Sequence, residues 1–417
     1  MTTSLNILSS SAAPARAAYP RFSSAAVTVP VASRRFTARA ASQAPTEKPA
    51  APSLHDMHSM APNGRDTTWA FNLQLAAVLL LVLGQVMEAL NLWGALPLGS
   101  AALWLHDCLF PFQLPLLFFC LGYLYQRYHH VRTAQDWAFS VRRAAIVLLV
   151  PFALFTLLYL MANSLAGMGR PLTPENLIVA LFLQPVQPLG YLYTAFLLIA
   201  ITPTVKSRRN AWGLVGAAAV AKLAIVALLT IPATVVGTAE MPAIITSVAE
   251  NWIWMAAGMA MALLRGITLL RSPQKAWALG ALWIAGSVIT FMAGWIGEAS
   301  HAVLDAIGIL WFTSLFSTVF RAGHQDGFFA LGTTYTMALF LMGGLFLRFA
   351  GAFMAAAGLL GATAPLLCVF TAFAAAFGPP ILAQKGLAKL GRADMAVYPA
   401  RYLPPAAQIL KDRPIAI

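Results

Sequence analysis

Two groups that can accept a proton lie close to the first long apolar stretches of the chain. His106 directly precedes Asp107, and a carboxylate beside an imidazole can orient the ring and raise its basicity. Glu88 lies three residues after Gln85, on the same face of the helix expected there. Attack of a hydroxyl on a carbonyl carbon needs a base of this kind. His106 and Glu88 are therefore candidate bases; the simpler interpretation is that both are solvated groups near the ends of membrane spans.

One cation interrupts the apolar run over residues 213–230. Lys222 stands there among alanines and branched aliphatic residues. A charge inside a bilayer is costly, so Lys222 should face a cavity, pair with a carboxylate, or extend its amine to the interface. Glu250 and Asp305 are the candidate partners. A structural ion pair, a contact to a substrate and interfacial solvation all remain open.

The composition places these groups in a membrane protein. Of 417 residues, 59% are hydrophobic and 10% charged, and the mean hydropathy is +0.73. Soluble domains have about 25% charged residues, so soluble and disordered classes are excluded. Ten apolar runs approach the roughly 20 residues that a span needs, which predicts an all-α polytopic bundle of about ten transmembrane helices. The runs cover residues 69–93, 108–126, 143–163, 190–205, 211–230, 243–264, 276–297, 302–320, 329–350 and 353–378.

The distribution of Lys and Arg orients this bundle. Loops after odd-numbered runs hold only Arg170 and, near a span end, Arg348, whereas loops after even-numbered runs hold eleven cations. Because basic loops stay on one side of a membrane, both termini are expected on that basic side. The net charge of +13 then reflects topology and a lipid-bilayer partner, with no nucleic acid. The eleven are Arg127, Arg132, Arg142, Arg143, Lys206, Arg208, Arg209, Arg265, Arg271, Lys275 and Arg321.

Four regions follow from the same patterns. Residues 1–46 contain five Arg and no Asp, Glu or Lys among many Ser and Ala, which is typical of an organelle transit peptide. This composition favours a plastid over a mitochondrion, and a plain disordered tail is the alternative. Residues 47–68 are expected to form a disordered, Pro-rich linker, residues 69–378 the membrane domain and residues 379–417 a C-terminal tail. No Cys or His spacing predicts a metal site, since the cysteines all lie in apolar runs and His55 and His58 fall in the linker.

Several segments together resemble a known family. Residues 112–123 read FQLPLLFFCLGY, residues 190–193 read GYLY, and residues 331–335 read LGTTY. The basic pair Arg142 and Arg143 precedes Pro151. In this order the segments resemble those of the acyltransferase 3 family of multispanning membrane O-acyltransferases. The resemblance covers roughly residues 69–378 and implies acyl-CoA as the donor, a hydroxyl acceptor and no bound cofactor.

The chain departs from the family at three positions. The family's first-span Arg and His fall on Gln74 and Gln85, and its second-span His falls on Gln113. A neutral amide donates and accepts hydrogen bonds but takes no proton near pH 7. The resemblance implies that these glutamines, with Tyr191, still line the site.

Arg142 and Arg143 would reach the phosphates of acyl-CoA, although topology alone also accounts for arginines in that loop.

Three functions remain open at this stage. The first is transfer of an acetyl or other acyl group to a hydroxyl of a sugar, lipid or small molecule. The second is a catalytically inactive relative that acts as a binding protein, scaffold or transporter, which the three glutamines favour. The third is an unrelated ten-span transporter with Lys222, Glu250 and Glu88 along its pathway.

Overall fold

The computed structural model describes residues 67–95, 100–128, 131, 133–167, 169–230, 242–295, 297–321, 327–360 and 364–403. These residues belong to one unit, residues 51–417. The expected transit peptide and nearly all of the linker lie outside the described residues. Every regular element among the described residues is helical, so the all-α prediction is confirmed for them.

Nine helices of 16 residues or more form the framework of the described part of the chain, joined by shorter ones. The long helices are α2 (Thr68–Leu92), α4 (Gln113–Tyr128), α6 (Val150–Ala166), α9 (Arg208–Thr230), α11 (Ala243–Leu263), α13 (Pro273–Met292), α14 (Glu298–Val319), α15 (Gly327–Ala356) and α16 (Pro365–Lys389). The shorter ones are α3 (Ser100–Trp104), α5 (Ala134–Ala144), α7 (Pro174–Phe182), α8 (Gly190–Ile201) and α12 (Ile267–Leu270).

Eight helical stretches of the described chain are long and apolar enough to cross a membrane, which makes this a multi-pass helical protein. They cover residues 68–92, 102–128, 134–165, 208–228, 273–292, 299–319, 327–356 and 365–389. Two of the ten expected spans are not among them. The run over 190–205 forms only the 12 residues of α8, about 18 Å of helix against a hydrocarbon core of about 30 Å. The run over 243–264 forms α11, which carries Glu250 and Asn251.

The last two spans are shifted from their expected bounds. Helix α15 continues to Ala356, and Gly358 at φ 66° then ends it, with the Leu359 amide donating to the Met354 carbonyl. Pro365 opens α16, as proline does at a first helical turn, and the helix continues to Lys389. Arg348 therefore lies inside a span and not at its end.

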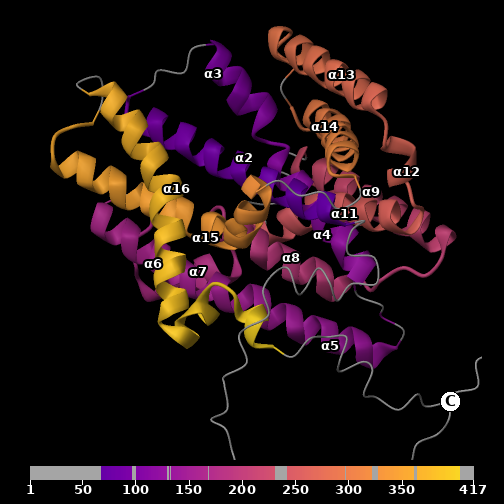
Figure 1. The fold of residues 1–417 in the computed structure, drawn as a ribbon, viewed down its shortest axis with the longest axis horizontal. Coiled ribbons are helices and arrows are strands. Elements are labelled where there is room, and N and C mark those ends of the chain that lie inside the picture. The colour runs from indigo at the N-terminus through magenta and orange to yellow at the C-terminus, as the bar shows by residue number, and fades with distance from the viewer. Residues whose placement is uncertain are drawn as a thin grey trace, which may run out of the picture. The chain divides into compact units, whose positions relative to one another are not determined.

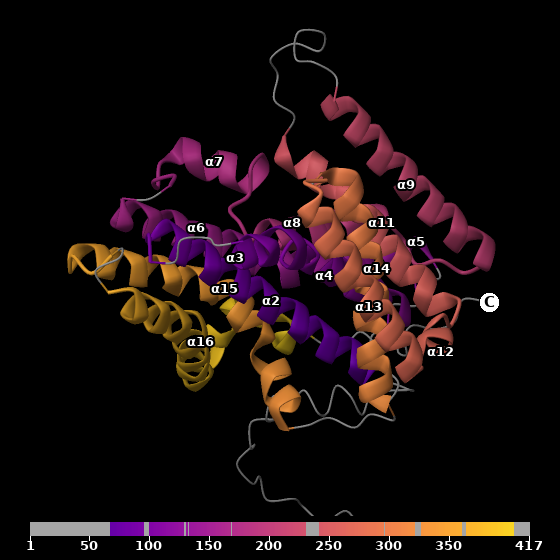
Figure 2. The same ribbon diagram turned by 90° about the horizontal axis from the view of Figure 1, so that it is seen from above.

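Helix α2 lies between two helix pairs (Figures 1 and 2): α15 and α16 are on one side, and α13 and α14 are on the other. It runs antiparallel to α4, since Thr67 Oγ1 lies 2.6 Å from Tyr128 Oη at one end and Gly84 faces Gln113 at the other. It runs parallel to α15, whose glycines Gly332, Gly343, Gly344 and Gly351 face α2 from one end to the other.

Helices α4 and α11 touch backbone to backbone. A Cβ on Gly122 would lie 2.0 Å from the Met255 carbonyl oxygen, and one on Gly258 would lie 2.1 Å from the Phe119 oxygen. Each glycine thus faces the carbonyl three residues before the other, which is the pattern of two parallel helices with Gly122 opposite Gly258. Small residues permit this close approach in membrane helix pairs.

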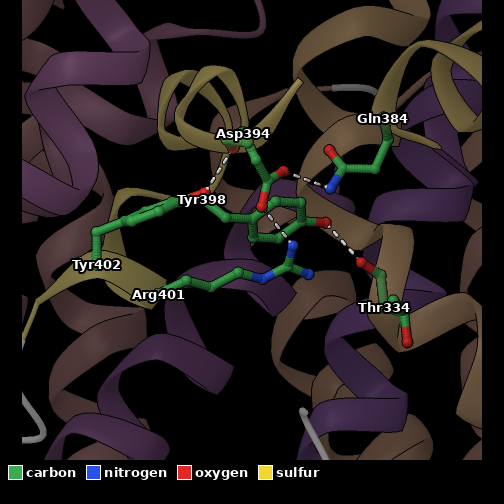
Figure 3. Close-up of polar contacts among 7 residues, drawn as sticks. Thr334, Gln384, Asp394, Tyr398, Arg401 and Tyr402 are labelled. Carbon is green, nitrogen blue, oxygen red and sulfur yellow. Dashed lines mark hydrogen bonds and ion pairs between the residues drawn. The ribbon is translucent and has the colours of Figure 1, made fainter. Parts of the chain in front are cut away.

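Beyond α16 the chain folds back instead of leaving the bundle (Figure 3). Asp394, 4% exposed, accepts hydrogen bonds from Arg401 Nη1 at 2.6 Å and from Gln384 Nε2 at 2.7 Å. The Tyr398 hydroxyl donates to the Thr334 carbonyl at 2.7 Å. Burial raises the pKa of Tyr398 to about 12, so this donor keeps its proton at neutral pH. The segment expected as a tail is thus fastened to α15 and α16 as far as residue 403.

We call the close contact between Gly122 of α4 and Gly258 of α11 the glycine crossing. It predicts that alanine substitutions at these two glycines destabilise the fold more than one at an exposed helical glycine. Gly122→Ala and Gly258→Ala place a methyl group against backbone that cannot move aside, and each should destabilise the fold by about 3 kcal/mol. Gly216→Ala is the control, because open space surrounds this α9 residue and alanine favours helix by about 1 kcal/mol. Thermal unfolding of the detergent-solubilised chain measures all three. Equal melting temperatures for Gly258→Ala and Gly216→Ala would contradict the crossing.

The C-terminal ion pair predicts a second difference. Arg401→Ala leaves the Asp394 carboxylate buried without its cation and should cost about 3 kcal/mol. Arg392→Ala removes a nearby exposed arginine and should leave stability unchanged. Limited proteolysis, read as release of the segment after α16, measures the effect. Equal cleavage rates for the two variants would mean that the pair does not hold the segment.

Candidate functional site

Gln85 points into a contact between three helices. A Cβ on Gly344 of α15 would lie 2.7 Å from both Gln85 Oε1 and the Tyr159 hydroxyl of α6. The phenol is fully buried, and the Gln85 oxygen is buried without a hydrogen-bond partner. Because Gly344 has no side chain, the amide oxygen and the phenol oxygen can both lie against it in the core.

Arg348 adds a cation one turn along α15. Its guanidinium carbon lies 4.4 Å from the centre of the Tyr159 ring, a cation–π contact. It also lies within electrostatic reach of Glu88. Glu88 is exposed and follows Gln85 by one helical turn. A carboxylate, a guanidinium, a phenol and an amide therefore lie in sequence along the α2–α15 contact.

Gln113 of α4 packs against α2 next to Gly84, the residue that precedes Gln85. A Cβ on Gly84 would lie 3.6 Å from Gln113 Nε2, and the Gln113 oxygen is buried without a hydrogen-bond partner. The structure therefore brings both glutamines at the family's histidine positions to one end of the α2–α4 pair. We call Gln85, Gln113, Tyr159 and Arg348 the core polar cluster.

Gln74 and Tyr191 lie outside this cluster. Gln74 precedes Gln85 by eleven residues, about 16 Å along α2. The Tyr191 ring packs against Phe118 at 4.8 Å and Phe340 at 5.5 Å. Phe340 precedes Gly344 by one turn of α15, so Tyr191 borders the cluster through packed aromatic rings.

The other candidate base is placed differently. His106 Nδ1 lies 2.8 Å from Asp107 Oδ1, so the two adjacent side chains do pair. Both belong to a π-helical turn, Leu105–Leu109, and the His106 side chain is 52% exposed. The next residue, Cys108, directs its thiol to the Ser287 carbonyl of α13 at 3.6 Å. The turn that carries His106 is thus held against α13, and its imidazole is oriented by Asp107.

The remaining cations have separate surroundings. Arg142 is exposed and Arg143 half-buried on α5. Lys222 Nζ lies 5.2 Å from the Trp254 ring centre of α11, so the structure pairs this intramembrane cation with an aromatic face. Lys222 lies on the α9–α11 contact and Glu88 beside α15, on different helix pairs.

A pocket opens between α5, α9 and α11. It encloses about 940 Å³, within the size range of small-molecule sites. Its lining includes Trp137, Trp252, Lys206 and Asn210, and neither Arg142 nor Arg143. Trp137 Nε1 is buried without a hydrogen-bond partner. We call this the α5–α9 pocket.

An extended segment, residues 202–206, forms one wall of the pocket. Gln126 donates to the Val205 carbonyl at 2.7 Å and accepts from the Val205 amide at 3.0 Å. Trp252 Nε1 donates to Thr202 Oγ1 at 3.0 Å. Side chains thus satisfy backbone groups that no helix satisfies, and the wall is fixed before any ligand binds.

Among the described residues, no three His, Cys, Asp or Glu side chains gather at metal-binding distances. The three cysteines are buried and free. His55 and His58 lie outside the described residues.

Sequence reasoning missed two members of the core polar cluster. Tyr159 sits in an apolar run without a motif, and Arg348 was counted as a charge near a span end. An arginine so far from the helix terminus is the signal that points to it, because intramembrane cations are rare outside functional sites.

Comparison with known proteins adds no support to the geometry described above. No family model, no curated protein and no solved structure matches this chain. The resemblance to the acyltransferase 3 family therefore remains a proposal.

Proposed function

We propose that this multi-pass membrane protein is an acyltransferase of the acyltransferase 3 type, which moves an acyl group from acyl-CoA to a hydroxyl. The observation that carries the proposal is the core polar cluster. Buried oxygens without hydrogen-bond partners are costly, about 1–3 kcal/mol each. Gln85 and Gln113 each hold one, at the positions where the family has histidine. An acceptor hydroxyl that reaches one of these amides would supply a missing hydrogen bond.

The cluster supports a mechanism without histidine. Gln85 Oε1 accepts a hydrogen bond that orients the acceptor hydroxyl, and Glu88 takes its proton. The hydroxyl oxygen bonds to the thioester carbon, and Arg348 stabilises the negative charge that develops on the carbonyl oxygen. The carbon–sulfur bond then breaks, and the CoA thiolate leaves with the proton.

The α5–α9 pocket supports a donor site. Its indole donor and Lys206 suit a planar, phosphate-bearing group. The pocket reaches Thr202, which lies eleven residues, or about 16 Å along α8, from Tyr191 at the border of the cluster. A long, flexible thiol arm such as that of CoA would be needed to span a separation of this size.

The same proposal includes ten spans: α11 would form one, and α8, too short to cross by itself, would cross together with the extended residues 202–206. Helix α11 runs parallel to α4, and α8 runs parallel to α11, as contacts from Thr194 to Ser247 and from Thr202 to Trp252 indicate. These directions agree with spans two, four and six of an alternating chain. We place both termini on the basic side, in an organelle membrane, with a plastid favoured by the N-terminal composition.

A second candidate function is binding of a polar molecule without catalysis. It is favoured by one observation: the described residues include two histidines, His106 and His301, and neither belongs to the core polar cluster. The amides would then hold a ligand that is not transformed.

Release of free CoA from labelled acetyl-CoA tests the proposed acyltransferase activity. Purified full-length chain receives acetyl-CoA and a panel of hydroxyl acceptors. Glu88→Gln should lower acceptor-dependent release by about 10²–10⁴-fold, because it removes the base. Arg348→Gln should lower it by about 10²-fold through lost charge stabilisation. Glu175→Gln, which removes an exposed carboxylate of α7, should have no effect.

The other outcomes are equally specific. Loss in His106→Ala with normal release in Glu88→Gln would assign the base to His106. Acyl-CoA binding by the wild type without release would favour the non-catalytic function. Absence of both binding and release would contradict the acyltransferase proposal.

A further inference from the structure

Three arginines line one small pocket at the ends of α4 and α11. The pocket encloses about 270 Å³, and its lining includes Arg127, Arg265, Arg271, Tyr123 and Thr268. Arg127 comes from the C-terminal end of α4, whereas Arg265 and Arg271 flank α12. None of the residues that line it is acidic. We call it the arginine pocket.

The glycine crossing brings these segments together. Gly122 and Gly258 lie opposite each other on parallel helices, so the residues that follow them leave the crossing in the same direction. Arg127 lies five residues beyond Gly122, and Arg265 lies seven beyond Gly258. Both cations therefore reach the same level, about 8–10 Å past the crossing. The fold thus brings two cations, which are more than 130 residues apart in the sequence, to one place.

Arg265 has a strained backbone conformation at the end of α11, where it lines the pocket. Its φ is 54°, the left-handed conformation that ends many helices, and Gly266 donates to the Met261 carbonyl at 3.1 Å. Glycine is the usual residue at that position, and another residue costs roughly 1–2 kcal/mol. The chain places arginine there and glycine one residue later. This cost is compensated if the arginine is needed in the pocket.

Size and charge together define the ligand. The volume is below the roughly 300–1,000 Å³ of sites for whole small molecules, so it suits one compact group. Arginine presents a forked set of donors that matches the oxygens of phosphate. Leu269, beside the pocket on α12, is 70% exposed, which suits an apolar chain attached to that group. Basic pockets between membrane helices commonly bind lipid headgroups.

We propose that the arginine pocket binds the phosphate group of an anionic ligand, either an anionic phospholipid or a free phosphate. This site is separate from the core polar cluster and does not depend on acyl transfer. Arg127 and Arg271 hold the phosphate oxygens, and Arg265 closes the pocket from the helix end.

Ligand-dependent melting of the full chain tests the site and separates the two sources. One arm adds inorganic phosphate to protein in nanodiscs of phosphatidylcholine. The other replaces part of that lipid with phosphatidylglycerol. Either ligand should raise the melting temperature of the wild type. A shift with phosphatidylglycerol alone identifies a lipid headgroup, and a shift with inorganic phosphate alone identifies a free phosphate.

Arg265→Gly is the decisive variant. Glycine relieves the strain at φ 54°, so the unliganded protein should melt no lower than the wild type, while its affinity for phosphate falls about tenfold or more. Arg127→Gln should weaken binding similarly. Arg208→Gln, which removes an exposed arginine of α9 outside the pocket, should bind normally. No shift in the wild type, or an equal shift in Arg265→Gly, would overturn the proposal.

Discussion

The backbone contact between α4 and α11 is the constraint on which the rest of the bundle depends. Where Gly122 meets Gly258, neither helix can slide along the other without driving a side chain into a carbonyl oxygen. Close packing of this kind transmits any local change because protein interiors have little free volume. The crossing fixes the height at which Arg127 meets Arg265 and, in the other direction along α4, the height at which Gln113 meets α2. Two sites at opposite ends of one helix thus share one register.

A row of glycines on α15 lets α2 pack closely against it, as the glycine crossing lets α4 pack closely against α11. Gly332, Gly343, Gly344 and Gly351 of α15 let the two parallel helices approach, and at Gly344 the absent side chain is replaced by the Gln85 and Tyr159 oxygens. An alanine there would fall 2.7 Å from both. The core polar cluster is therefore a product of helix packing. Its polar groups come from four helices, α2, α4, α6 and α15, which lie far apart in the sequence.

Local patterns in the sequence predict the helical framework, but they do not predict contacts between residues that lie far apart in the chain. Apolar runs and the alternation of basic loops predicted a polytopic helical bundle, since hydrophobicity and charge act locally. The order of motifs indicated Gln85 and Gln113, which the structure brings to one level. Tyr159 carried no local signal, and Arg348 was misjudged because α15 continues past its expected end. The pairing of Asp394 with Arg401 depends on a fold-back after α16 that hydropathy does not reveal.

The glutamines make the strongest case that the site is built for a ligand. Replacing histidine by glutamine removes the proton acceptor but keeps hydrogen-bonding capacity, so the substitution alone favours binding over catalysis. If the positions had lost all function, apolar residues would remove the cost of burying amide oxygens without partners, about 1–3 kcal/mol each. The chain instead retains both amides and sets an intramembrane arginine beside one of them. The same arginine lies within electrostatic reach of Glu88, the proposed base. In the proposed mechanism one cation thus stands near both the base and the reacting carbonyl, and a site without histidine becomes compatible with acyl transfer.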